Sequence, residues 1–597
     1  MDGFYGKIRI IDLNRQRCET VSIPDRVLAE TLGGKGLASW LLYQHNPPGV
    51  DPMAPENCLI FVTGPVTASS IWGSSRYGVF TKSPQTGFYA ESYAGGKVPE
   101  AMDATGFDAL VLKGRCQAPT VLAVFPDQVR FHEAGDLWGL ETYAAEDAVV
   151  ERYARSESGF KRPGAVVIGP AAENGVCFSV IKNDHWRSAG RTGVGTVLGA
   201  KRVKAVLFQG DRRRPLHDPE GVRQMAKGLS AEAKDNPGVL AYKRMGTSQM
   251  VRVMNGANAF PTGYWEKGKC DHWEEISDQA LHSRCDVRPN ACAKCLMACG
   301  RMTTIRTGRH TGLVIEGPEY ETIYAFGGLC LVNSIEEIAY LNDICDRLGM
   351  DTITAGNLCA FTMEAVRRKR IDYPIVYGDV EAIASLLKKI ACREGIGEVL
   401  AQGIRYAAKA WNLEDMAVHV KGLEPAGYDP RSLKGMGLAY ATSDRGACHL
   451  RSTFYKPELA GMIDPEQIEG KAQMFIDFED RLTIFDTLIL CRFYRDLYPW
   501  EALAGMVHAV TGLPDDPAAL RSRAAAIATL VRRFNIREGL CPQDDKLPPR
   551  LHQHLAGSDK TISEAQLDTM VQDYYRLRGW DASGIPPQLE EHVSWPA

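Results

Sequence analysis

Hydrophobic residues follow two different patterns along the 597-residue chain, and the change between them divides it. Up to about residue 210 they form short apolar runs separated by glycine-containing turns, a pattern typical of β-strands. After a charged, proline-containing segment at 211–221, apolar residues recur at helical spacing, as over 335–349, 380–395 and 517–535. We therefore predict an α+β protein with a β-rich N-terminal domain over 1–211. Two mainly α-helical domains should follow over 212–415 and 416–597.

Composition narrows the classes of function. With 69 basic and 73 acidic residues the net charge is −4, which argues against nucleic acid as a partner. No signal peptide and no apolar run of about 18 residues is found, so we expect a cytoplasmic protein without a membrane partner. The 16 cysteines are many for a reducing compartment. Clustered thiols there favour a metal site over disulfides.

The sharpest local motif is a cluster of three cysteines, Cys292, Cys295 and Cys299. Iron–sulfur clusters usually take four cysteine ligands, so a fourth ligand would lie elsewhere in the chain. Zinc also accepts thiolates. Spacing alone therefore leaves open a zinc-stabilised binding protein without redox activity.

Acidic and aromatic residues suggest proton chemistry further along the chain. Glu316 opens the segment Glu-Gly-Pro-Glu-Tyr-Glu, in which a turn could aim carboxylates into a dry pocket and raise their pKa. A solvated acidic turn is the alternative. His449 could exchange a proton near neutral pH, and Tyr428 could donate a hydrogen bond to an oxyanion. Isolated histidines and tyrosines are more often structural.

An arginine- and glycine-rich segment at 186–195 indicates an anion site. Arg187 and Arg191 supply forked donors, and the glycines let backbone N–H groups approach a ligand. A purely structural turn is the alternative. No Walker-type phosphate loop and no convincing dinucleotide fingerprint is present, so this chain should not bind ATP, flavin or NAD itself.

Taken in order, these motifs resemble the aldehyde ferredoxin oxidoreductase family of tungstopterin enzymes. The resemblance covers nearly the whole chain, from Gly33-Gly34-Lys35-Gly36 through the cysteine cluster to the segment 486–491. It implies that the N-terminal domain cradles two pterins, whose dithiolene sulfurs hold tungsten or molybdenum. It also implies a four-iron–four-sulfur cluster and Mg²⁺.

The resemblance assigns residues to these cofactors. Cys491 would join Cys292, Cys295 and Cys299 as the fourth cluster ligand. Glu316 and His449 would handle protons, with Tyr428 near them. Two elements of the pattern Asp-x-x-Gly-x-Asp or Cys would bind the pterins, one over 346–351 and one over 486–491, although Ile489 replaces the second glycine. The cofactor-binding residues would be Arg76, Tyr93, Gly95, Arg187, Ser188, Asp346, Met350, Asp351, Arg451 and Asp486; Tyr93 and Ser188 would lie where magnesium binds.

The implied activity is oxidation of an aldehyde to a carboxylic acid, or the reverse reduction. Electrons would leave through the cluster to ferredoxin or to a ferredoxin-like iron–sulfur subunit, with a flavin subunit if NAD is reached. We expect an oligomer. Reduction of aromatic acyl-CoA rings on the same scaffold is the alternative.

Overall fold

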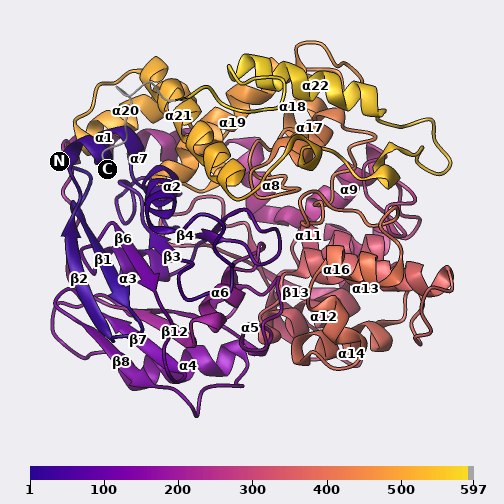
Figure 1. Ribbon diagram of the computed structural model, residues 1–597, viewed down its shortest axis with the longest axis horizontal. Helices are drawn as coiled ribbons and strands as arrows, with labels where there is room; N and C mark the ends of the chain where they lie inside the picture. The colour runs from indigo at the N-terminus through magenta and orange to yellow at the C-terminus, as the bar shows by residue number, and fades with distance from the viewer. Residues whose placement is uncertain (589–597) are drawn as a thin grey trace.

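Two six-stranded sheets build the N-terminal part of the computed structural model, which describes residues 1–588 (Figure 1). The first sheet has the order β2-β1-β6-β3-β4-β5 and the second β11-β10-β9-β12-β7-β8. The strands are β1 (Lys7–Asp12), β2 (Arg17–Ser22), β3 (Leu59–Val62), β4 (Tyr77–Lys82), β5 (Tyr89–Ala94), β6 (Ala109–Lys113), β7 (Thr120–Val124), β8 (Val129–Glu133), β9 (Gly164–Val167), β10 (Ile181–Asn183), β11 (Arg187–Ala189) and β12 (Val203–Phe208).

The burial of each strand follows its sequence. The residues of β3 and β4 are buried on both faces, and both segments are rich in β-branched and aromatic residues. The edge strand β2 is exposed along its whole length and carries charged and polar residues. Strands β4 and β5 pair antiparallel with Gly78 opposite Tyr93. The end of β5 thereby carries Tyr93 and Ala94 to the edge of a cavity described below.

Helices make up most of the remaining chain, as predicted. Within the N-terminal part lie α1 (Asp25–Thr31), α2 (Gly34–His45), α3 (Val98–Asp103), α4 (Thr142–Tyr153), α5 (Pro170–Glu173) and α6 (Val194–Ala200). The middle part has α7 (Pro219–Ala233), α8 (Pro237–Met245), α9 (Met250–Gly256), α10 (Asp278–Arg284), α11 (Tyr320–Ile323), α12 (Ile335–Leu348), α13 (Thr352–Arg367), α14 (Val380–Cys392), α15 (Ile396–Leu400) and α16 (Ile404–Trp411). The last part has α17 (Lys434–Thr442), α18 (Tyr455–Leu459), α19 (Lys471–Leu488), α20 (Trp500–Thr511), α21 (Pro517–Arg537) and α22 (Glu564–Leu577). These helices and the two sheets confirm the α+β fold class.

A small third sheet interrupts the helical region, and the sequence analysis did not predict it. It pairs β13 (Cys285–Asn290), β14 (Gly300–Ile305) and β15 (Val314–Glu316) in antiparallel order. Its first strand alternates only weakly between buried and exposed positions and contains a proline, so its apolar pattern is faint. The hairpin formed by β13 and β14 carries the three clustered cysteines at its tip.

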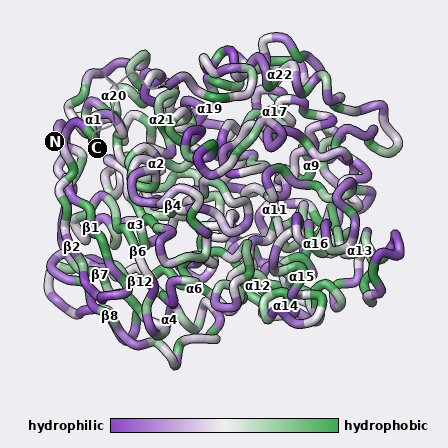
Figure 2. The backbone as a smooth tube through the Cα atoms, viewed as in Figure 1, coloured by the Kyte–Doolittle hydropathy of each residue, from purple (hydrophilic) through white to green (hydrophobic). Residues whose placement is uncertain are grey.

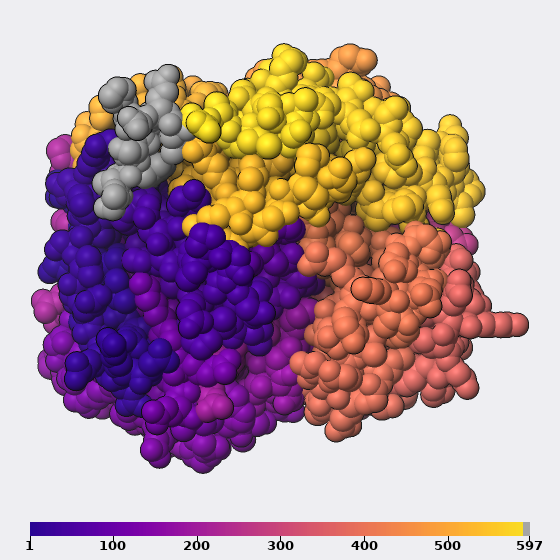
Figure 3. All heavy atoms as spheres, in the orientation of Figure 1, coloured from indigo at the N-terminus to yellow at the C-terminus, as the bar shows by residue number. Residues whose placement is uncertain are grey.

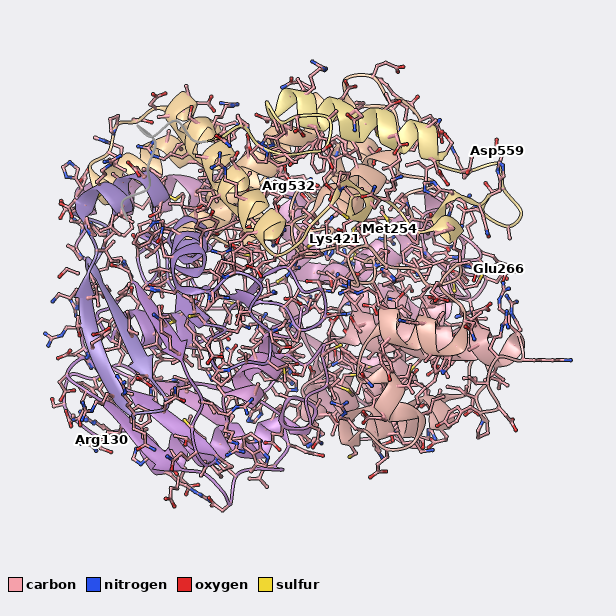
Figure 4. The ribbon with its side chains drawn as sticks, viewed as in Figure 1. Arg130, Met254, Glu266, Lys421, Arg532 and Asp559 are labelled. Atoms are coloured by element: carbon pink, nitrogen blue, oxygen red, sulfur yellow. The ribbon has the colours of Figure 1, made fainter. Side chains whose placement is uncertain are left out.

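The three sequence regions occupy separate territories of the face in view (Figure 3). The sheets lie on one side, α12–α16 lie on the other, and α17–α22 cover the top (Figure 1). Hydrophobic and hydrophilic segments alternate along the backbone throughout all three regions (Figure 2). Buried ion pairs reinforce the last region: Lys421 and Arg532, both labelled in Figure 4, each lie 2.6 Å from a carboxylate oxygen of Asp545.

Within residues 1–588, none of the helices combines the length and the apolarity needed to cross a bilayer.

Candidate active site and metal centre

Two adjoining cavities lie where the N-terminal sheets meet the helical regions. The first has a volume of about 300 Å³, and all four predicted cluster cysteines line it. The second has a volume of about 370 Å³, and Glu321, Tyr428, His449 and Arg451 line it. Five of the named residues belong to the walls of both cavities: Arg76, Tyr93, Ser188, Glu321 and Cys491. Of the other predicted cofactor residues, Gly95, Arg187, Asp346, Met350 and Asp351 line the first cavity, and Asp486 lines the second.

The backbone of Gly73 joins the distant Cys491 to the cysteine hairpin. Its N–H donates to the carbonyl of Lys294 at 2.8 Å, and its carbonyl accepts from the N–H of Cys491 at 2.9 Å. The Tyr494 hydroxyl accepts a hydrogen bond from the N–H of Leu296 at 2.6 Å. The thiol of the remote Cys491 is thereby brought to the same space as the three neighbouring thiols of the hairpin.

The cysteine-lined cavity requires a residue without a side chain at position 95. A β-carbon on Gly95 would lie 2.7 Å from the sulfur of Cys292, which is too close for any contact without a shift. The glycine therefore lets β5 approach the cysteines.

The donor set fits an iron–sulfur cluster. Within residues 1–588, no three Cys, His, Asp or Glu side chains converge closely enough to hold a single metal ion. The thiols instead surround a cavity, which suits a multi-iron cluster with four cysteine ligands better than one zinc ion. Burial raises the pKa of the Cys292 thiol, and the positive charge of Arg187 opposes that rise. The arginine therefore favours the thiolate form, which is the form that binds metals.

Arg76 lies between the two cavities. Its Nη1 is 3.8 Å from the sulfur of Cys491, and its Nη2 donates to the carbonyl of Tyr93 at 3.0 Å. Ser188 accepts a hydrogen bond from Lys182 Nζ at 2.7 Å. The sequence thus anticipated a group of residues that does assemble, although their roles toward a cofactor stay predictions.

The two predicted pterin elements are both helix ends. Asp351 caps the start of α13 by accepting from the N–H of Thr354 at 3.1 Å, and Asp346 near the end of α12 accepts from Lys182 Nζ at 2.5 Å. Gly349 ends α12 with φ +77°, and Ile489 ends α19 with φ +58°. The two turns therefore share a left-handed backbone, so the isoleucine adopts the conformation of the glycine that it replaces.

Arginine donors around Asp486 are only partly used. Arg451 Nη1 lies 3.0 Å from Asp486, and Arg492 contacts the same carboxylate. Within the described part of the chain, Nε and Nη2 of Arg451 are buried without any hydrogen-bond partner. Buried guanidinium donors that lack partners at a cavity wall fit an anionic cofactor such as a phosphorylated pterin.

Glu316 and His449, the predicted proton-handling pair, line different cavities, and their roles stay predictions. His449 Nε2 lies 3.4 Å from Oε1 of Glu321, and the Tyr428 ring stacks on the imidazole with centroids 5.3 Å apart. Glu316 instead lines the first cavity, where its Oε1 lies 2.5 Å from Arg187. The structure therefore brings His449 and Tyr428 together with Glu321, a residue that the sequence analysis did not single out.

Electrostatics distinguish these groups further. Burial raises the pKa of Glu321 to about 7. Burial and the nearby Arg191 hold the pKa of His449 well below its ordinary value, so its imidazole is neutral at pH 7. A carboxylate that titrates near neutrality beside a neutral histidine can accept and pass on a proton.

Comparisons with known proteins identify the family of the chain. Family models match the chain over residues 8–210 (aldehyde ferredoxin oxidoreductase, N-terminal domain) and 224–591 (aldehyde ferredoxin oxidoreductase, domains 2 and 3). A tungsten-containing aldehyde ferredoxin oxidoreductase of Pyrococcus furiosus is 32% identical over 99% of both chains. The WOR-like subunit of an aliphatic sulfonate oxidoreductase from the same organism is 27% identical over 99% of this chain and 97% of its own.

A solved structure supports the fold alone. The active site complex BamBC of benzoyl coenzyme A reductase, in complex with 1,5-dienoyl-CoA, aligns with a TM-score of 0.84 at 23% identity. The alignment covers 98% of this chain and 96% of that one. From the two family models and the relative at 32% identity, we conclude that the chain belongs to the aldehyde ferredoxin oxidoreductase family.

Proposed function

We propose that this protein oxidises aldehydes to carboxylates with a tungsten bis-pterin cofactor and passes the electrons to a four-iron–four-sulfur cluster. The observation that carries the proposal is the adjacency of the two cavities: one is lined by four cysteines and the other by Glu321 and His449. The reaction is RCHO + H₂O → RCOO⁻ + 3 H⁺ + 2 e⁻. It needs an electron acceptor and a base, and each cavity suits one of them.

The residues that would hold the cofactors are those of the cavity walls. Cys292, Cys295, Cys299 and Cys491 would ligate the cluster. Asp346, Asp351 and Asp486 would meet pterin N–H groups, while Arg76, Arg187 and Arg451 would face phosphate oxygens. When bound, the tungsten bis-pterin supplies a two-electron acceptor beside the substrate. Magnesium near Tyr93 and Ser188, and molybdenum in place of tungsten, stay predictions from the resemblance.

The side chains of the second cavity would manage water and protons. Glu321 in its carboxylate form would accept a proton as water adds to the carbonyl carbon. Neutral His449 can donate or accept one hydrogen bond, and Tyr428 would hold its ring by stacking. Tyr428 and His449 are buried and Glu321 is partly buried, which limits competing bulk water.

The electron partner lies outside this chain. We expect ferredoxin or a ferredoxin-like iron–sulfur subunit to take single electrons from the cluster, with a flavin subunit if NAD is the final acceptor. Cytoplasmic location and oligomerisation also stay predictions of the sequence analysis.

Metal analysis combined with dye-linked turnover tests the proposed function. The anaerobically purified protein should contain iron and tungsten or molybdenum, and should reduce a viologen dye with simple aldehydes. Cys295→Ser should lower the iron content and the visible absorbance of the cluster. Buried Cys359, which lines neither cavity, offers the matched control Cys359→Ser, expected to keep its iron. Zinc without iron, or turnover of benzoyl-CoA but of no aldehyde, would contradict the proposal.

A further inference from the structure

One buried arginine of the second cavity makes no ion pair within residues 1–588. Arg495 is only 2% exposed, and its Nη1 donates to the carbonyl of Arg492 at 2.8 Å. Its Nε and Nη2 find no hydrogen-bond partner within residues 1–588, and it forms no ion pair with any carboxylate there. The adjacent carboxylate of Asp496 pairs with Lys456, and it also lies close enough to Arg495 to raise the pKa of the guanidinium.

An isolated buried cation is costly, so its place in the structure calls for a physical reason. A guanidinium taken out of water without an ion pair recovers only part of its lost hydration from carbonyl oxygens and more distant charges. Other arginines of this cavity have such partners: Arg451 and Arg492 both meet Asp486. Arg495 also lines this cavity, but it differs from Arg451 and Arg492 because it makes no ion pair within residues 1–588.

Two phenols also lie beside Arg495. Tyr455 and Tyr242 are close enough to the guanidinium to raise its pKa. Tyr455 stacks on Tyr428 with centroids 4.1 Å apart, and Tyr428 in turn stacks on His449. A row of flat rings therefore leads from the guanidinium to the proposed proton-handling pair, all within one cavity.

We propose that Arg495 selects aldehydes that carry a carboxylate at the end remote from the aldehyde carbon, with an aromatic ring as the preferred spacer. This inference rests on the proposed function, because the aldehyde group must lie beside Glu321 and His449. The planar fork of arginine offers a carboxylate two parallel hydrogen bonds, and the aromatic walls offer faces for a ring.

The test compares two aldehydes of nearly equal shape, 4-formylbenzoate and 4-methylbenzaldehyde, with the holoenzyme and a viologen dye. The wild type should prefer 4-formylbenzoate in kcat/KM by about 10- to 100-fold, as expected for hydrogen bonds between charged groups. Arg495→Met should lose this preference mainly through KM, while turnover of 4-methylbenzaldehyde changes less than about twofold. Arg495→Lys keeps the charge but not the fork, so it should retain part of the preference.

Arg481→Met is the matched control. Arg481 is a partly exposed arginine on α19 that influences Arg495 electrostatically but does not line the second cavity. This variant removes one positive charge nearby and should keep the preference for 4-formylbenzoate. An equal loss in both variants would assign the effect to general charge and overturn the role of Arg495. A wild type without preference, or Arg495→Met impaired equally with both aldehydes, would also overturn it.

Calorimetric titration separates this inference from the proposed function. Benzene-1,4-dicarboxylate should bind the wild-type holoenzyme more tightly than 4-methylbenzoate, and Arg495→Met should lose that difference. If no aldehyde is oxidised but benzene-1,4-dicarboxylate still binds more tightly through Arg495, aldehyde oxidation is refuted and the anion site is supported. Normal aldehyde turnover without the pattern would refute the anion site alone.

Discussion

At the scale of single residues, the pKa of Glu321 makes the proposed base testable. Burial raises that pKa to about 7, so the carboxyl is protonated below this pH and is a base above it. We expect kcat/KM to rise with pH through about 7 and then to level off. Glu321→Gln should lower kcat/KM by at least about 100-fold and remove the pH-dependent limb.

Glu316→Gln is the matched control, because Glu316 belongs to the same short motif but contacts Arg187. It should keep the pH-dependent limb while its iron and tungsten contents stay normal. A limb that disappears in Glu316→Gln and persists in Glu321→Gln would reverse the assignment. The sequence could not decide between these carboxylates, since both line the first cavity and only the folded structure shows that Glu321 also lines the second.

At the scale of elements, the sequence predicted two features: the change from sheets to helices, and the grouping of three cysteines at one site. Both are visible in a sequence because each depends on residues that are close together in the chain. It missed the hairpin of β13 and β14, whose strands have little apolar alternation. It also missed Arg495, since neither burial nor a missing ion-pair partner is visible in a sequence. Ile489 shows a further limit: a β-branched residue gives no sign that its backbone is left-handed.

Ile489 also allows the cost of that backbone to be compared with packing. A left-handed conformation costs a residue with a β-carbon about 1–2 kcal/mol, whereas removing a fully buried isoleucine side chain costs about 2–5 kcal/mol. Packing should win, so Ile489→Gly should lower the melting temperature of the holoenzyme despite relieving the backbone.

Lys369 provides the control, because it has φ +56° and an exposed side chain. Lys369→Gly removes the same backbone strain without losing buried contacts, so it should leave the melting temperature unchanged or raise it slightly. An Ile489→Gly protein that melts above the wild type would show that strain, not packing, dominates at the end of α19.

At the scale of the whole molecule, the C-terminal region packs closely against the N-terminal region. A β-carbon on Gly34 of α2 would overlap the carbonyl oxygen of Thr487 at the end of α19, and one on Gly64 would overlap that of Leu488. These glycines bring the first sheet and the second predicted pterin element into backbone contact. The wall of the cofactor cavities therefore depends on how regions far apart in the sequence dock.

Glu538, just beyond α21, is the charged residue at which this docking can be tested. Its Oε2 lies 2.6 Å from Nζ of Lys82 on β4 and accepts from the N–H of Gly49 at 3.0 Å. Both side chains of the ion pair are buried, so Glu538→Gln leaves Lys82 without a counter-charge in a dry interface.

Breaking a buried ion pair from one side costs about 3–5 kcal/mol of stability. For Glu538→Gln we therefore expect a lower melting temperature and faster proteolysis between the N-terminal and C-terminal regions. Glu381→Gln, which alters an exposed pair with Arg309, should change neither measurement. If both variants melt like the wild type, the interface is held by its apolar and backbone contacts, and the buried ion pair adds nothing to the docking.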